Sequence, residues 1–147
     1  MVIGILGESC VGKSTLADKL KDRLGAEVFT GKDYLRLAKS EAVAKKLFQK
    51  KLEQAVSGEN IVYVITEREH LSLLPDGAVR VLMTADLELI LERFALRMRG
   101  NLPDPVKAML QKKHGCFDAE HCDYHIHNNA ETDAVCDAVL QNRGERR

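Results

Sequence analysis

The chain has 147 residues, of which 45% are hydrophobic and 30% are charged, enough for one domain with a substantial core. Basic and acidic residues balance at 22 each, so no broad basic field attracts nucleic acid or a membrane surface. No signal peptide is evident, and no apolar run approaches the length of a membrane span. We therefore expect a cytoplasmic protein, a monomer or weak homodimer, with no nucleic acid and no membrane as partner.

The first elements surround a glycine-rich motif. The apolar run at residues 2–6 predicts a buried strand, and Leu16, Leu20 and Leu24 recur at helical spacing before Gly25. Between them, residues 7–15 read GESCVGKST, which matches G-x-x-x-x-G-K-S. A strand before this motif and a helix after it form the context in which the motif binds phosphate.

The motif predicts a site for a nucleotide with Mg²⁺. Backbone N–H groups of such a loop form an anion-binding nest, and the following helix adds free N–H groups and the positive end of its dipole. Lys13 would supply charge for the β- and γ-phosphates, and Ser14 a hydroxyl ligand for Mg²⁺. The candidate nucleotide-binding residues are Gly7, Glu8, Ser9, Cys10, Val11, Gly12, Lys13, Ser14 and Thr15.

The rest of the chain alternates strands and helices. A short strand is predicted at residues 26–29, and a helix at 40–57 that begins with Ser40 as its cap. The apolar stripe of this helix is Val43, Leu47, Phe48, Leu52, Ala55 and Val56. Two nearly continuous apolar runs favour buried parallel strands at residues 60–66 and 78–83. With helices at 86–99, 106–113 and 132–141 and a strand at 124–127, we predict a three-layer α/β fold with a five-stranded parallel sheet.

Four patches in chain order resemble the small P-loop kinases, the nucleoside monophosphate kinase group that includes adenylate, cytidylate and shikimate kinases. They are the phosphate loop, TGKDYLR at 30–36, LERFALRMRG at 91–100 and DYHIHNNAET at 123–132. The resemblance implies ATP- and Mg²⁺-dependent phosphoryl transfer by a single P-loop kinase domain, with a short lid at about residues 100–116. The D-G-x-P-R segment of adenylate kinases is missing, because residues 66–70 read TEREH, and so is their long lid.

Two arginines on the helix predicted at 86–99 are candidate catalytic groups together with Lys13. Arg93 and Arg97 lie four residues apart and have no acidic partner at helical spacing. Guanidinium groups suit phosphoryl oxygens, so both arginines would neutralise charge on the group in transfer. The alternative is a solvated basic helix end.

The candidate acceptor-binding residues follow the second and third strands, at the sheet edge where ligands bind. The resemblance implies that Arg36 grips an acceptor phosphate and Thr30 contacts its base. Asp33 would hold an acceptor hydroxyl, as in shikimate kinases, or simply cap a helix. Glu67 is a candidate to orient Mg²⁺ through water, and Arg68 to replace the missing arginine. No aspartate stands there as the usual magnesium-orienting acid.

Two further groups lie late in the chain. Asn128, Asn129 and Ala130 precede the last helix, and the resemblance implies that they pack beside adenine; a plain turn is the alternative. A cluster of histidine and cysteine residues suggests a structural zinc site, but its spacing disfavours one because no C-x-x-C pair is present. The cluster consists of His114, Cys116, His121, Cys122, His125 and His127.

The acceptor is the least determined part of this interpretation. A nucleoside monophosphate is favoured because TGKDYLR resembles a monophosphate-binding segment. One alternative is a kinase of a non-nucleotide metabolite alcohol, similar to shikimate kinase. Another is a nucleotide-binding regulatory protein without transferase activity, which the missing acid and the TEREH segment favour.

Overall fold

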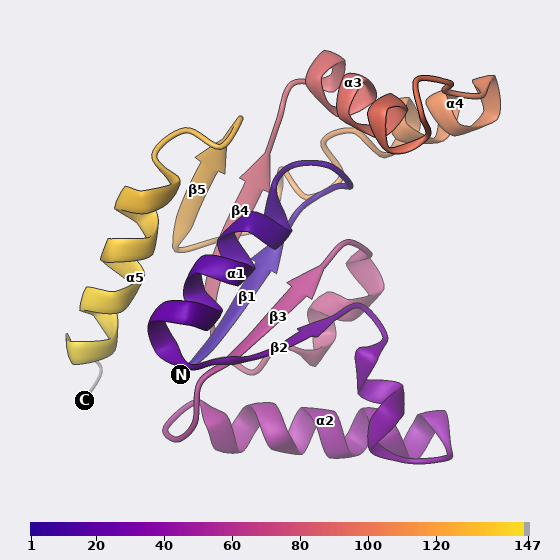
Figure 1. Cartoon of the computed structure of the whole chain (residues 1–147). Helices are drawn as coiled ribbons and strands as arrows, with labels where there is room; N and C mark the ends of the chain where they lie inside the picture. The colour runs from indigo at the N-terminus through magenta and orange to yellow at the C-terminus, as the bar shows by residue number, and fades with distance from the viewer. Residues whose placement is uncertain (146–147) are drawn as a thin grey trace.

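The computed structural model describes residues 1–145, and it contains the predicted five-stranded parallel sheet (Figure 1). The strands pair in the order β2-β3-β1-β4-β5, and all four pairings are parallel. Each observed strand begins and ends within a residue of its predicted bounds. The strands are β1 (Val2–Leu6), β2 (Glu27–Thr30), β3 (Ile61–Ile65), β4 (Val79–Thr84) and β5 (Tyr124–His127).

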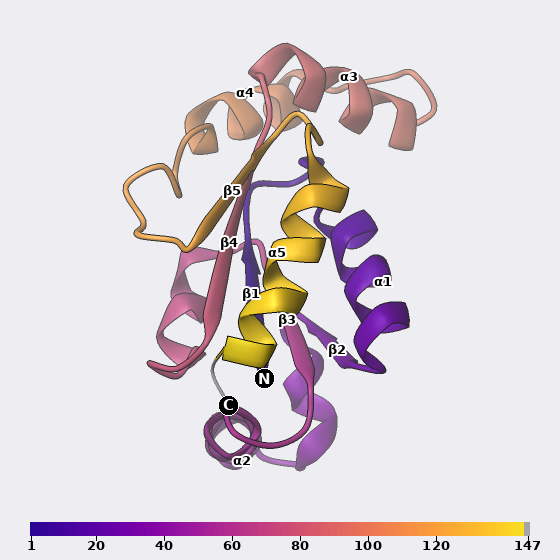
Figure 2. The same cartoon turned by 90° about the vertical axis from the view of Figure 1, so that its left-hand side faces the viewer.

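Helices cover both faces of this sheet and complete the predicted three layers (Figures 1 and 2). The helices are α1 (Lys13–Leu24), α2 (Glu41–Ala55), α3 (Leu87–Arg97), α4 (Asp104–Lys113) and α5 (Thr132–Glu145), with 3₁₀ helices η1 (Asp33–Leu37) and η2 (Arg68–Leu73). α1 and α5 pack on one face, and α2, η1 and η2 pack on the other. α3 and α4 lie beyond the carboxyl ends of the strands.

The pleat of β1 shows how one strand serves two cores. Ile3 and Ile5 point into the core under α1 and α5, whereas Val2 and Leu6 point into the core under α2. Successive side chains of a strand face opposite sides of the sheet, and here both sides are covered. For this reason the central strands read as continuous apolar runs rather than alternating ones.

The α2 helix begins as predicted, and its buried face was predicted in part. The Ser40 hydroxyl accepts a hydrogen bond from the Val43 N–H (3.5 Å), which is the expected cap. Phe48, Leu52 and Ala55 are buried as predicted, but Val43 and Leu47 are 49% and 45% exposed, and Ala44 is buried in their place. Small Ala44 lies one turn before Phe48 and continues the buried stripe, which a choice by side-chain hydrophobicity overlooks.

The topology determines where ligands can bind. β1 and β3 are neighbours, yet β1 leads through α1 to β2 on one side, and β3 leads through η2 to β4 on the other. In open parallel sheets, ligands bind outside the carboxyl ends of the strands at such a switch point. The glycine loop after β1 and the TEREH segment after β3 therefore share this position.

Candidate active site

The glycine loop adopts the geometry that its motif predicts. The Gly7 N–H donates to the Ile65 carbonyl at the end of β3 (3.1 Å), and a Cβ on Gly7 would lie 2.5 Å from the carbonyl oxygen of Met83. Only glycine permits this approach. Cys10 and Gly12 have φ of 66° and 98°, and such left-handed residues turn consecutive backbone N–H groups into a nest.

The N-terminus of α1 closes the nest. Gly12 precedes the helix and offers no side-chain cap, and the first turn contains no acidic residue. The first intrahelical hydrogen bond runs from Leu16 N–H to the Gly12 carbonyl, so the N–H groups before Leu16 have no intrahelical acceptor. Ser14 and Thr15 are exposed there. This arrangement binds anions.

Lys13 lies deeper than its sequence context indicated. Its side chain is buried rather than open to solvent, with a residue exposure of 7%. The Nζ atom donates to the carbonyl oxygens of Gly7 (2.8 Å) and Glu8. Burial lowers the pKa of Lys13 from 10.5 to about 8, and the nearby charge of Arg97 adds to this effect. A bound phosphate would favour the charged amine again.

Contacts from distant parts of the chain support the loop. Arg93 of α3 donates to the Cys10 carbonyl (3.0 Å). With the Asn129 amide oriented so that its NH2 group and its oxygen both have partners, it donates to the Val11 carbonyl and accepts from Arg93, each at 3.3 Å. The amide lies so close that any Cβ on Gly12 would overlap it. Thus α3 and the β5–α5 loop meet at the glycine loop, as the predicted nucleotide site requires.

The neighbouring part of the β5–α5 loop is held by Asp86. The Asn128 amide donates to the Asp86 carboxylate (2.9 Å) and accepts from the Asp86 N–H (2.9 Å). His127 also contacts this carboxylate (3.1 Å). The hydrogen bonds from Asn128 and His127 lower the pKa of Asp86. Ala130 follows on the exposed surface of the loop.

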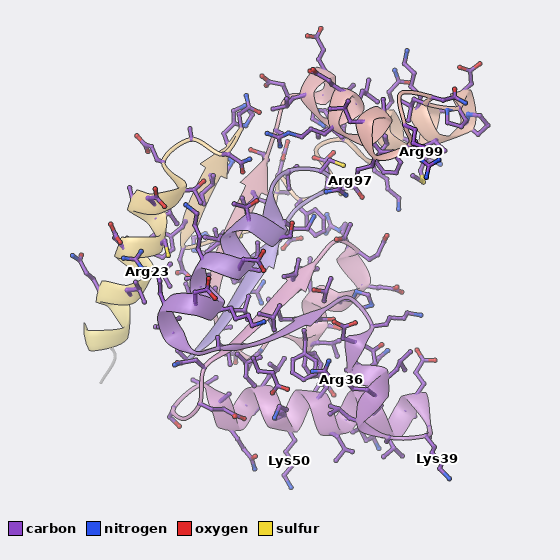
Figure 3. The ribbon with its side chains drawn as sticks, in the orientation of Figure 1. Arg23, Arg36, Lys39, Lys50, Arg97 and Arg99 are labelled. Atoms are coloured by element: carbon purple, nitrogen blue, oxygen red, sulfur yellow. The ribbon has the colours of Figure 1, made fainter. Side chains whose placement is uncertain are left out.

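The two predicted catalytic arginines differ in their surroundings. Arg93 is half-buried and bonded to the glycine loop. Arg97 is exposed at the end of α3 that overhangs this loop, with Arg99 close by (Figure 3). Within the described residues, the Arg97 guanidinium group forms no hydrogen bond or ion pair. Arg97 is therefore the arginine with a free charge near Lys13.

The candidates after β2 make local contacts instead of facing the glycine loop. The Asp33 carboxylate accepts from the Thr30 N–H (2.9 Å). Arg36 pairs with Glu27 (3.2 Å), and its guanidinium group lies 4.3 Å from the centre of the Phe29 ring. Figure 3 shows Arg36 beside α2, away from the end where α3 lies. The structure thus does not bring Asp33 and Arg36 to the phosphate site.

The candidates after β3 contact the end of the predicted lid. Glu67 pairs with Lys113 at the end of α4 (3.3 Å). Arg68 donates to the Cys116 carbonyl (2.5 Å) and pairs with Glu120 (2.8 Å). Each pair has at least one side chain that is about half exposed, so each contributes at most about 1 kcal/mol. Together they hold residues 113–120 against the carboxyl end of β3.

Glu8 makes a contact that the sequence did not reveal. Its side chain is buried, and one carboxylate oxygen lies 3.1 Å from His114 Nδ1 while the other accepts from the Gly115 N–H (3.1 Å). The carboxylate therefore points toward residues 114–115, and only the Glu8 backbone remains available for phosphate. Its partners lie more than a hundred residues away, so local spacing gives no signal for them.

Two cavities lie beside Glu8. One, of about 170 Å³, is lined by Glu8, Ser9, Thr66, Glu67, Phe94, Met109, Leu110, Lys113 and Cys116. The other, of about 370 Å³, is lined by Glu8, Leu82, Thr84, Ala85, Asp86, His114, Asp118, His125 and His127. Although several histidines gather here, no group of three or more His, Cys, Asp or Glu side chains in the described part of the chain is arranged to hold a metal ion.

Comparisons with known proteins show which proteins the chain resembles. No protein-family model matches the chain. It is 30% identical over 112 residues to a shikimate kinase of Pelotomaculum thermopropionicum, covering 71% of this chain and 63% of that protein, so the match spans less than two thirds of the relative. The fold matches a shikimate kinase from Acinetobacter baumannii in complex with shikimate, with a TM-score of 0.63, 17% identity and coverage of 96% and 93%. A gluconokinase from Sinorhizobium meliloti matches with a TM-score of 0.58, 15% identity and coverage of 99% and 96%.

The strand order, the glycine loop on α1 and these likenesses define a small P-loop kinase fold. Within that fold, the chain resembles the nucleoside monophosphate and shikimate kinase-like proteins. Both the predicted fold and the resemblance are confirmed. Among the described helices, none combines the length and apolar character needed to cross a bilayer.

Proposed function

We propose that the chain transfers the γ-phosphoryl group of ATP, with Mg²⁺, to a hydroxyl group of a small metabolite that is not a nucleotide. The observation that carries this proposal is the cavity of about 170 Å³ beside an open phosphate loop. Pockets for drug-sized ligands measure about 300–1,000 Å³, so this cavity suits a compact acceptor. The metabolite-alcohol alternative therefore replaces the nucleoside monophosphate favoured from the sequence. Likeness to a shikimate kinase and a gluconokinase supports the same choice.

The residues at the loop fit a nucleotide with Mg²⁺. The nest and the uncapped α1 N-terminus offer N–H donors, and the exposed Ser14 hydroxyl is free to ligate the metal ion. Bound ATP supplies the phosphoryl group, and Mg²⁺ neutralises its phosphate oxygens. Glu67, at the end of β3, is our candidate to orient the hydrated ion. Asn128, Asn129 and Ala130 would flank the adenine ring.

In this proposal, positively charged side chains neutralise the charge on the phosphate groups. Lys13 exchanges its two carbonyl acceptors for phosphate oxygens, and Arg97 lies free to meet the charge that develops on the transferring group. Arg93 holds the loop in place and offers part of its guanidinium group. The lid at residues 100–116 closes over the nucleotide and excludes water, while its far end stays tied through Lys113 and Cys116.

Acceptor binding is assigned to the segment after β3 rather than to the segment after β2. Arg68 and Glu67 lie at the switch point, and Glu67 lines the small cavity. Thr30, Asp33 and Arg36 would reach it only after breaking their present contacts at β2. We therefore propose no direct role for these three residues.

A coupled assay tests the proposal. The purified chain is incubated with ATP, Mg²⁺ and a panel of hydroxy acids, sugar acids and nucleoside monophosphates that includes shikimate and gluconate, and ADP is measured. We expect ADP to rise with one of the non-nucleotide acceptors. Stimulation by nucleoside monophosphates alone would contradict the acceptor class. Tight ATP binding without any stimulated ADP would instead favour the regulatory protein, which the lack of an aspartate at the end of β3 supports.

A further inference from the structure

Two formally charged side chains, Glu8 and Lys13, are buried within the described residues, and both belong to the glycine loop. The amine of Lys13 has an evident purpose in a phosphate site. The carboxylate of Glu8 does not, because a negative charge there opposes the binding of an anionic nucleotide. Removing a carboxylate from water costs several kcal/mol even in a relaxed protein. A buried carboxylate in a cleft is a candidate functional group for this reason.

The surroundings of Glu8 fix its position but leave it able to react. His114 and Gly115 each hold one carboxylate oxygen, at 3.1 Å. Because the carboxylate only accepts hydrogen bonds, His114 must present a protonated Nδ1 to it. Two oxygens offer about four acceptor positions, so about two remain unused. Glu8 also lines the small cavity together with Ser9 and Thr66.

Other carboxylates at this edge of the sheet are less suitable as a base for an acceptor. Asp33 is exposed and bonded to the Thr30 N–H, outside the cavity. Glu67 lines the cavity, but its side chain is 51% exposed and paired with Lys113. Glu8 combines burial, fixed orientation and contact with both the cavity and the phosphate loop.

We propose that Glu8 is the catalytic base of the reaction proposed above, on which this inference rests. The acceptor hydroxyl gives its proton to the Glu8 carboxylate as its oxygen forms a bond to the γ-phosphorus. The bond from that phosphorus to the bridging oxygen breaks, and its electron pair leaves on the nucleoside diphosphate. His114 and Gly115 are positioning groups that aim the carboxylate. The proton passes from Glu8 to solvent when the product leaves.

The variant Glu8→Gln separates this chemistry from a structural role. The glutamine carbonyl can still accept from Gly115, and its amide can donate to His114 in the other imidazole tautomer. Folding should therefore survive. We expect kcat to fall by roughly 10²–10⁴-fold, the range for a lost general base. The Kd for ATP should stay the same or decrease, because a negative charge beside the phosphate site is removed.

A matched control changes the same chemical group outside the small cavity. Asp118→Asn removes a carboxylate from the wall of the larger cavity, and it should leave kcat unchanged. Glu8→Asp keeps the charge but shortens the side chain, so it should retain more activity than Glu8→Gln. The measurements are ATP affinity, the thermal midpoint and single-turnover rates with a saturating acceptor.

Each outcome has a distinct meaning. Full turnover by Glu8→Gln would overturn the assignment of the base and leave the proposed kinase activity standing. Loss of ATP affinity and a lower thermal midpoint in both Glu8 variants, in proportion to lost activity, would show that Glu8 is structural, which also overturns the assignment. Absence of acceptor-stimulated ADP from the unmodified chain would overturn the proposed function and this inference with it.

Discussion

The glycine loop on the donor side of the site and the segment after β2 at residues 30–36, here called the β2 corner, are built from contacts of very different range. At the glycine loop, Arg93 reaches Cys10 across 83 positions of sequence, and Asn129 reaches back to Val11. At the end of β2, the Asp33 to Thr30 contact spans only three positions. The donor side is thus assembled by elements from the whole fold, whereas the charged side chains of the β2 corner are paired with residues close in sequence.

This difference bears on what each side can do. A loop held by three separate elements is preorganised, and preorganised groups lose little free energy when they meet charge in a transition state. The β2 corner pairs its charged side chains locally and, within the described residues, forms no hydrogen bond or ion pair with the glycine loop, so its sequence can change without changing the phosphate site. We expect substitutions on the donor side to affect kcat and those at the β2 corner to affect stability slightly.

The largest expected effect is at Lys13. Lys13→Ala should reduce transfer by at least about 10²–10³-fold, the loss found when one preorganised donor to a transition state is removed. It should also weaken ATP binding, while the thermal midpoint holds because a buried charge is lost. ADP release and nucleotide titration provide the measurements. Turnover near that of the unmodified chain would exclude a mechanism based on the phosphate loop.

Two arginine variants distinguish the roles of Arg93 and Arg97 on the donor side. Arg97→Gln should lower kcat by roughly 10²-fold at an unchanged thermal midpoint, because the free guanidinium group meets charge mainly in the transition state. Arg93→Gln should also destabilise the protein by about 1–2 kcal/mol through loss of its bond to Cys10. The test compares midpoints without ligand and single-turnover rates. A large fall in the Arg97→Gln midpoint with an intact rate would make Arg97 structural.

The lowered pKa of Lys13 gives a pH dependence with a definite sign. Between its folded pKa of about 8 and its unfolded value of 10.5, the unfolded chain binds more protons, so stability must rise with pH. Burial raises the pKa of Cys116 and Cys122 above 9.0 and that of Tyr63 above 10.0, and these groups work in the opposite direction above those ordinary values. We expect a gain of about 1 kcal/mol from pH 8 to 9 in denaturant titrations without nucleotide. Lys13→Met should abolish this gain.

The smallest expected effect is at Arg36. Its exposed pair with Glu27 and its position over Phe29 predict that Arg36→Ala costs less than about 1 kcal/mol of stability. The acceptor kcat/KM should change less than about twofold, since the residue lies outside the small cavity. A loss of roughly 1.5–3 kcal/mol in kcat/KM, with ATP affinity unchanged, would restore the sequence-based role of Arg36 in gripping an acceptor phosphate.

The donor side could be predicted from sequence because its motif specifies backbone geometry. Gly7 is needed where the loop crosses the Met83 carbonyl, and Gly12 where the Asn129 amide approaches. The β2 corner was inferred from TGKDYLR, which carries one extra residue at Lys32 relative to the adenylate kinase pattern. The η1 turn that follows directs Arg36 toward Phe29. A resemblance of residue types did not specify that direction.

Other features depend on packing that one sequence cannot show. The contact of Glu8 with His114 could be predicted only if the position of the end of α4 above β1 were known. In α2, the small residue Ala44 fits against the sheet and belongs to the buried stripe, whereas the more hydrophobic Val43 is half exposed. In both cases tertiary structure outweighs the local pattern.

The dependence of the loop on Asn129 has a consequence for biosynthesis. Asn129 follows the edge strand β5, which pairs only with β4, and it supports a loop made near the start of the chain. At about 5–20 residues per second, the ribosome supplies Asn129 several seconds after Val11. During this interval a nascent chain carries the complete glycine motif without its support. Nucleotide binding by chains arrested on the ribosome should therefore report the docking of β5, and it would follow the completion of folding rather than its beginning.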